Sequence, residues 1–242
     1  MIKIFRKIRQ KRLKESKFNQ YLLYAIGEIV LVVIGILFAL QINSWNEKRK
    51  QEATLNAIYK IIQSDLETDS EVIDIVIAEM APILPYYMKA IKGTLIREDF
   101  KKLDTIGGLM TGFPDISLQN RGLNLLLKNV HFDENTDNEL LRNIPLFYTK
   151  YKTEIDVDLR EIQETWSNRS LRWTNTFDWY GDFSLQIYND QYIEYALTSP
   201  IHRNQVIDFV SLFYRNYLGH LREYQEESKE IIRLIKEQTK AK

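Results

Sequence analysis

Residues 21–42 read YLLYAIGEIVLVVIGILFALQI, an apolar run that contains one charged residue, Glu28. About 22 residues, each rising about 1.5 Å along a helix, span roughly 33 Å, which is enough to cross a hydrocarbon core of about 30 Å. Apolar residues occupy every face of this run instead of one stripe, which argues against a buried helix of a soluble protein. The run therefore predicts one transmembrane helix over residues 21–42.

The charge of Glu28 does not overturn this prediction. A charge at the bilayer centre costs about 2.5–3.5 kcal/mol, whereas fourteen Leu, Ile, Val and Phe side chains together contribute about −4 to −8 kcal/mol. A cleaved signal peptide is not expected, because the run is longer than a signal-peptide core and no small-residue cleavage site follows it.

The charges on either side of the run indicate its orientation. Eight Lys and Arg residues and one Glu precede it, whereas Lys48, Arg49 and Lys50 alternate with Glu47 and Glu52 after it. The excess of positive charge on the cytoplasmic side predicts that residues 1–20 form a basic cytoplasmic tail and that residues 43–242 lie across the membrane. The tail either lies along anionic lipid headgroups or is solvated, and both alternatives stay open.

The composition limits the classes of function. The 242 residues have a formal net charge of zero, so no basic excess points to nucleic acid as a partner. With no cysteine there is no disulfide framework, thiolate zinc site or thiol nucleophile. Nine glycines and five prolines are few for this length, which favours long helices.

The pattern of apolar residues predicts that residues 43–242 form one all-α domain. Residues at helical spacing continue the membrane helix outward to Pro82 or Pro85: Leu55, Ile58, Ile62, Leu66, Ile73, Val76 and Met80. A short helix from Pro82 to Lys92, closed by Gly93, is expected next.

Three further helices follow from capping patterns. Asp115 or Ser117 is expected to cap a helix through Leu127, and Asp133 or Thr136 one that Pro145 kinks. Ser199 and Pro200 begin a long last helix. Long first and last helices favour an antiparallel pair, so the expected architecture is an elongated helical bundle that stands on one membrane helix.

Two groups of residues are candidate sites. Gly35 and Ala39 lie on the same face of the span as Glu28 and form a pair of small residues that lets a second helix approach closely. We expect this face to associate with a second copy or with another membrane protein. Aromatic residues concentrate between 166 and 195 and either stack a flat ligand or pack the end of the bundle, among them Trp166, Trp173, Trp179 and Tyr180.

The chain resembles a known family in its membrane-proximal part. The segments YAIGEI (24–29), VVIGIL (32–37), ALQIN (39–43) and WNE (45–47), after a basic IRQKRLKESKF (8–18), resemble the opening of a family of single-span membrane proteins from Bacteroidota that is defined by a domain of unknown function. A weaker resemblance extends through residues 119–151. The resemblance implies a Gram-negative inner membrane and a periplasmic domain, and it adds no ligand or catalytic residue.

No catalytic pattern emerges from the sequence. The three histidines are scattered, so no metal site is expected, and acids such as Asp156 and Asp158 are expected on solvated helix faces. We therefore expect no enzyme and no cofactor. The leading hypothesis is a membrane-anchored interaction or scaffold protein, with the bilayer and a homo-oligomer or membrane protein as partners. The alternatives are a sensory module that binds a small ligand through its aromatic region and, less favoured, a proton-coupled, stator-like subunit that uses Glu28.

Overall fold

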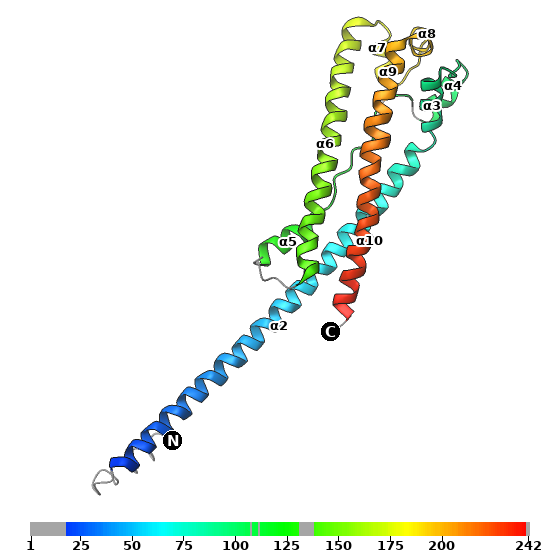
Figure 1. Cartoon of the computed structure of the whole chain (residues 1–242). Helices are drawn as coiled ribbons and strands as arrows, with labels where there is room; N and C mark the ends of the chain where they lie inside the picture. Colours follow the sequence, from blue (N-terminus) through cyan, green and yellow to red (C-terminus); the bar gives the residue numbers. More distant parts are fainter. Residues whose placement is uncertain (1–17, 107, 111, 131–137, 241–242) are drawn as a thin grey trace. The chain divides into compact units, whose positions relative to one another are not determined.

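The computed structural model of the protein describes residues 18–106, 108–110, 112–130 and 138–240, and every regular element in these ranges is a helix (Figure 1). The all-α prediction is confirmed for the described residues. The elements are α2 (Phe18–Met80), α3 (Leu84–Lys92), α4 (Asp99–Ile106), α5 (Arg121–Asn129), α6 (Glu139–Thr176), α7 (Tyr180–Ser184), α8 (Asp190–Thr198), α9 (Pro200–Phe209), the π-helix η1 (Val210–Tyr217) and α10 (Leu218–Lys240).

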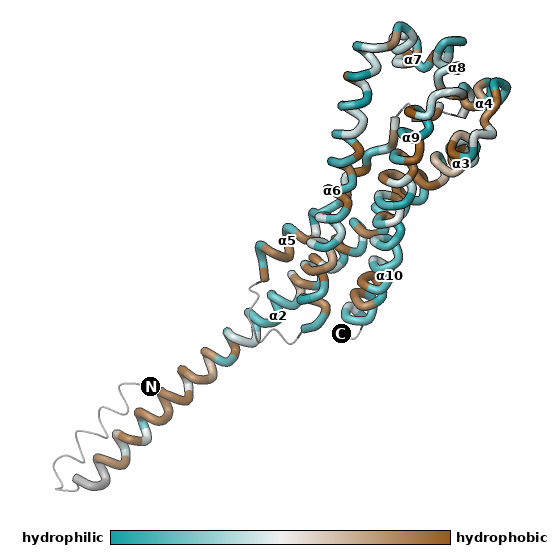
Figure 2. The backbone as a smooth tube through the Cα atoms, turned by 45° about the horizontal axis from the view of Figure 1, so that its top comes forward, coloured by the Kyte–Doolittle hydropathy of each residue, from teal (hydrophilic) through white to brown (hydrophobic). Residues whose placement is uncertain are grey.

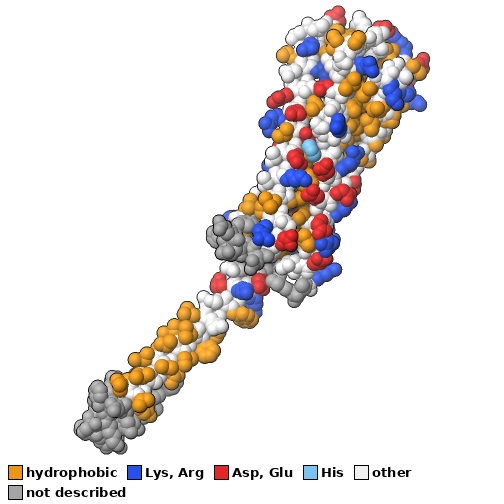
Figure 3. All heavy atoms as spheres, in the orientation of Figure 1, with side chains coloured by type: hydrophobic (Ala, Val, Ile, Leu, Met, Phe, Trp, Pro, Cys, Tyr) orange, Lys and Arg blue, Asp and Glu red, His pale blue; other side chains and the backbone are white. Residues whose placement is uncertain are grey.

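Helix α2 belongs to two compact units, residues 1–56 and residues 57–242. In the first unit, no described side chain from Leu22 onward is buried. Figure 2 shows the strongly hydrophobic half of α2, and Figure 3 shows apolar side chains covering its visible face. Among the described helices, α2 alone is long and apolar enough to cross a membrane, with a mean hydropathy of 2.6 in its most apolar window.

In the second unit, residues 57–80 of α2 run antiparallel to the C-terminal helices. Lys236 lies 3.5 Å from Glu67, and the Tyr214 hydroxyl donates to the Met80 carbonyl over 3.1 Å. Helix α6 lies beside α10 (Figure 1), and Lys150 donates to Glu227 over 3.1 Å. These contacts bring residues 57–80 of α2 alongside the C-terminal helices within this unit.

The predicted helix ends agree with the structure where the signal is local. Helix α2 ends at Met80. The next residue, Ala81, precedes Pro82, and proline disfavours helical geometry in the residue before it. Helix α3 ends at Gly93, whose φ of 68° suits glycine. The Ser199 side chain caps α9 by accepting from the His202 N–H.

Two expectations about helix ends need correction. The expected caps Asp133 and Thr136 lie outside the described residues, and the observed N-cap of α6 is Asn138, which accepts from the Leu141 N–H. The last helix is helical throughout 200–240, but residues 210–217 adopt π geometry, which the sequence pattern does not indicate.

The helix expected from Asp115 or Ser117 begins only at Arg121, because distant side chains hold the preceding backbone. The Ile116 N–H donates to the Tyr217 hydroxyl over 3.2 Å, and the Gln119 N–H donates to the Asp69 carboxylate over 3.0 Å. These N–H groups are therefore not used in helical bonds, and residues 112–120 stay non-helical.

Buried Asp65 caps the start of α5 from outside that helix. It accepts from the Gly122 N–H over 2.8 Å and from the Arg121 side chain over 2.6 Å, whereas the Asn120 side chain makes no capping bond. This carboxylate takes the place that an N-cap side chain usually fills and suits the positive end of the helix dipole.

Gly122 is required by this contact. A Cβ added there would lie 2.5 Å from Ile62 Cγ1 and 2.8 Å from Ile62 Cα. We expect Gly122→Ala to lower the free energy of unfolding by about 1–3 kcal/mol, because the α2 backbone cannot yield cheaply. Denaturant unfolding of the detergent-solubilised full-length protein, followed by tryptophan fluorescence, measures this loss.

Gly219→Ala is the matched control. A Cβ at Gly219 meets nothing within 4 Å, and alanine favours a helix over glycine by up to about 1 kcal/mol. This variant should therefore be at least as stable as the wild type. If the two variants have equal stability, the close approach of α5 to α2 does not restrict the side chain at position 122.

Candidate functional site

The predicted association face on the apolar part of α2 is uncovered in a single chain. Gly35 and Ala39 each lie within about 20° of Glu28 around the helix axis, and all three are exposed. A Cβ added at Gly35 would meet nothing within 4 Å. This face therefore has room for a second helix, and its role in association stays a prediction.

The predicted aromatic residues lie at the end of α6 and around α7. Trp173 and Trp179 are buried with their ring centroids 5.1 Å apart. Trp166 and Tyr180 are half-buried, and the Tyr180 hydroxyl is hydrogen-bonded to the Ser170 hydroxyl. The structure thus brings the four residues into one packed region.

This region has little space for a ligand. A cavity of about 10 Å³ is lined by Trp166, Arg169, Ser170, Trp173, Tyr180 and Phe183. That volume holds about one water molecule. Phe183 and Tyr195 cover the Trp173 ring, with centroids 5.1 and 6.2 Å away. A flat ligand would have to displace these rings before it could stack.

Two buried basic side chains adjoin the aromatic rings. Arg169 is 6% exposed, and Asp208 lies 4.0 Å away. His202 is 0% exposed, and neither of its ring nitrogens has a hydrogen-bond partner among the described residues. Burial, reinforced by the Arg169 charge, lowers the pKa of His202 to about 4. His202 is therefore neutral near pH 7.

Asp158 was expected on a solvated helix face, but the structure does not place it there. It is buried, and its Oδ2 lies 2.6 Å from His220 Nδ1. The partner comes from α10, so a pattern on α6 alone does not reveal it. Asp156 is exposed, as expected, and pairs with Lys152 at 3.2 Å.

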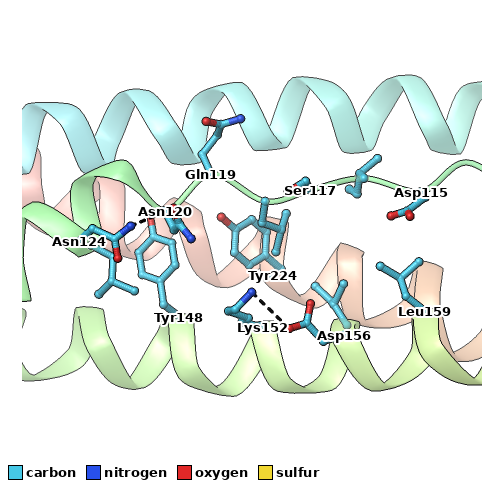
Figure 4. A pocket seen from close by; sticks show the side chains of 14 residues that line it. Asp115, Ser117, Gln119, Asn120, Asn124, Tyr148, Lys152, Asp156, Leu159 and Tyr224 are labelled. Carbon is cyan, nitrogen blue, oxygen red and sulfur yellow. Dashed lines mark hydrogen bonds and ion pairs between the residues drawn. The ribbon is translucent and has the colours of Figure 1, made fainter.

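A groove lies between residues 115–124 and α6 (Figure 4), with a volume of about 470 Å³. Its lining combines aliphatic, amide and charged side chains: Asp115, Ile116, Ser117, Leu118, Gln119, Asn120, Leu123, Asn124, Tyr148, Lys152, Ile155, Asp156, Leu159 and Tyr224. The groove exists because residues 115–120 are held away from helical geometry by Asp69 and Tyr217.

The groove was not among the sites predicted from the sequence, although the sequence contains a signal for it. Asp65 and Asp69 are one turn apart and interrupt the apolar stripe that includes Ile62, Leu66 and Ile73. Acids on a core-facing stripe require buried donors. The pattern indicates that donors exist but does not say that residues 119–122 supply them.

The described residues contain no group of three or more His, Cys, Asp or Glu side chains that could hold a metal ion. The nearest approach to a reactive pair is the Asp158–His220 contact. It has no nucleophile identified beside it, so we assign it no reaction.

The buried His202 predicts an acid-dependent stability. Its folded-state pKa of about 4 is below its ordinary 6.5, so on acidification the unfolded chain binds a proton that the folded chain does not. This pKa difference has no effect on stability above pH 6.5. As the pH falls to about 4, it lowers the free energy of unfolding by up to about 3 kcal/mol. Urea unfolding at several pH values measures the slope.

His202→Gln removes the titrating ring and should flatten the curve between these pH values, whatever its effect at neutral pH. Above pH 6.5 the two curves should run parallel, which serves as the internal control. Parallel curves down to pH 4 would show that His202 titrates normally in the folded protein.

Residues 28–109 match the model of a family of unknown function (DUF6090). The match begins within the apolar segment and continues through α2, α3 and α4, so it covers less than half of the chain. No curated protein and no solved structure matches the chain. The match supports the presence of a domain of unknown function.

Proposed function

We propose that the chain is a single-pass protein of the bacterial inner membrane that acts as an interaction or scaffold protein. The observation that carries the proposal is the apolar half of α2, of which none is buried within the chain. So long an exposed apolar surface needs lipid or another protein to cover it.

The orientation in this proposal rests on charge. The basic tail before residue 21 lies in the cytoplasm, and the helical domain lies in the periplasm. The resemblance of the membrane-proximal segment to proteins from Bacteroidota supports a Gram-negative host. In this arrangement the helical bundle displays its surface in the periplasm, where it meets its partners.

The span contributes a second contact. Gly35 and Ala39 let a neighbouring helix approach closely, and Glu28 on the same face is then buried in the seam. A carboxyl in such a seam needs a hydrogen-bond partner on the neighbouring helix, because an unpaired charge in hydrocarbon is costly. The partner is a second copy of the chain or another membrane protein.

A sensory module is the second candidate. It is favoured by one observation, the unpaired polar atoms of Arg169 and His202 beside the aromatic rings. A small polar ligand that displaced part of the aromatic packing would pair with them. Ligand-dependent thermal stabilisation is the sign that separates this candidate from a scaffold.

The association of the span is tested by native mass spectrometry of the full-length protein in mild detergent. We expect the wild type to run as a defined oligomer or with a stoichiometric partner. Gly35→Leu should disperse it, because the larger side chain holds the helices apart. Glu28→Gln keeps the shape of the side chain and shows whether its charge contributes to the association.

Gly27→Leu is the matched control, because it is the same substitution about 80° or more from that face and Gly27 is equally open. It should leave the assembly intact. If the wild type and all three variants run as the same monomer, the span does not mediate assembly.

A further inference from the structure

We propose that the groove between residues 115–124 and α6 binds a short extended peptide segment of a protein partner. The inference rests on the proposed function and deepens it by assigning the contact surface and the chemistry of the partner. The shape, the backbone and the side chains of this groove point to one kind of ligand.

The dimensions fit a peptide. The α6 wall runs from Tyr148 to Leu159, which is about 16 Å along a helix. An extended chain rises about 3.3 Å per residue, so about five residues fill this length. The volume of about 470 Å³ lies within the range of about 300–1,000 Å³ typical of ligand sites.

The non-helical wall offers backbone groups to a ligand. The bonds of the Ile116 and Gln119 N–H groups to Tyr217 and Asp69 fix this segment in place. Within the described part of the chain, no hydrogen bond is recorded for the backbone N–H or C=O of Ser117 or Leu118. A rigid segment with unpaired main-chain groups is the kind of edge to which an extended peptide adds.

The amide side chains on the same wall complement peptide groups. Asn124 donates to Asn120 over 3.2 Å (Figure 4). This bond uses one donor group and one acceptor, which leaves the Asn120 amide nitrogen as a donor and the Asn124 carbonyl oxygen as an acceptor. A peptide group presents one C=O and one N–H, so the pair can bind it from both sides.

The apolar part of the lining accepts a side chain of the ligand. Leu118, Leu123 and Leu159 are only partly buried, so aliphatic surface is open between the polar rims. Pockets for alternate side chains supply specificity where main-chain bonds supply affinity. We therefore expect an aliphatic residue within the bound peptide.

Other ligand classes fit less well. Tyr148 and Tyr224 are the aromatic residues of the lining, and both are buried, at 4% and 0% exposed, so no open ring face is available to stack a sugar or a base. The charged lining residues are Asp115, Asp156 and Lys152. This excess of carboxylates repels phosphate and favours a peptide that is neutral or basic.

The test selects a phage-displayed library of linear heptapeptides on the full-length protein in nanodiscs. Synthetic copies of the enriched peptides are then titrated by fluorescence anisotropy. We expect a shared motif with an aliphatic residue and at least tenfold weaker binding to Leu123→Arg, which places a charge in the groove. Leu125→Arg, about 160° from Leu123 around the same helix and exposed, should bind within twofold of the wild type.

A second variant keeps the test valid if Leu123→Arg does not fold by circular dichroism. Asn120→Ala with Asn124→Ala removes the exposed amide pair and should also weaken binding at least tenfold. The inference would be overturned if no binding peptide is enriched or if peptides bind the groove and control variants equally. It would also be overturned if the groove binds members of an oligosaccharide panel instead of peptides. Native mass spectrometry of the same samples shows whether the span assembles. A groove that binds no peptide is therefore distinguished from a chain that does not act as an interaction protein.

Discussion

Two buried carboxylates on α2 hold the helical domain together. Asp65 and Asp69 are 0% and 3% exposed, and withdrawing such groups from water is costly unless donors replace the lost hydration. Asp69 accepts from the Gln119 N–H over 3.0 Å and from the Tyr224 hydroxyl over 2.6 Å. It therefore ties together α2, the segment before α5, and α10. Burial raises the pKa of Asp69, and these two donors oppose that shift.

The same carboxylates decide where α5 begins. Helix formation from residue 115 would take the Gln119 N–H into the helix and leave Asp69 with one donor fewer, so the structure keeps the segment non-helical. Asp65 then binds the first turn of α5, and Gly122 allows that turn to lie against the backbone of Ile62. The groove beside α6 is a consequence of this arrangement and needs no separate stabilisation.

This dependence on distant residues explains what sequence reasoning could and could not predict. The end of α2 before Pro82, the end of α3 at Gly93 and the cap at Ser199 follow from local chemistry and were predicted. The start of α5 depends on Asp69, and a pattern within residues 115–127 offers Asp115 and Ser117 as equally good caps. The pairing of Asp158 with His220 could not be predicted for the same reason, since the two residues lie on different helices.

A helical protein has few places where its backbone can recognise a partner, because helical N–H and C=O groups bond within the helix. In the described residues, segment 112–120 lies against helices yet leaves main-chain groups unpaired at Ser117 and Leu118. The proposed contact face of the apolar part of α2 has the opposite chemistry, since a helical backbone is bonded within the helix and the proposed contact relies on small side chains such as Gly35 and Ala39. Two surfaces with such different requirements do not compete for one ligand. In the function proposed above, a chain with both surfaces would hold a membrane helix and an extended peptide at the same time, which is the physical basis for proposing a scaffold.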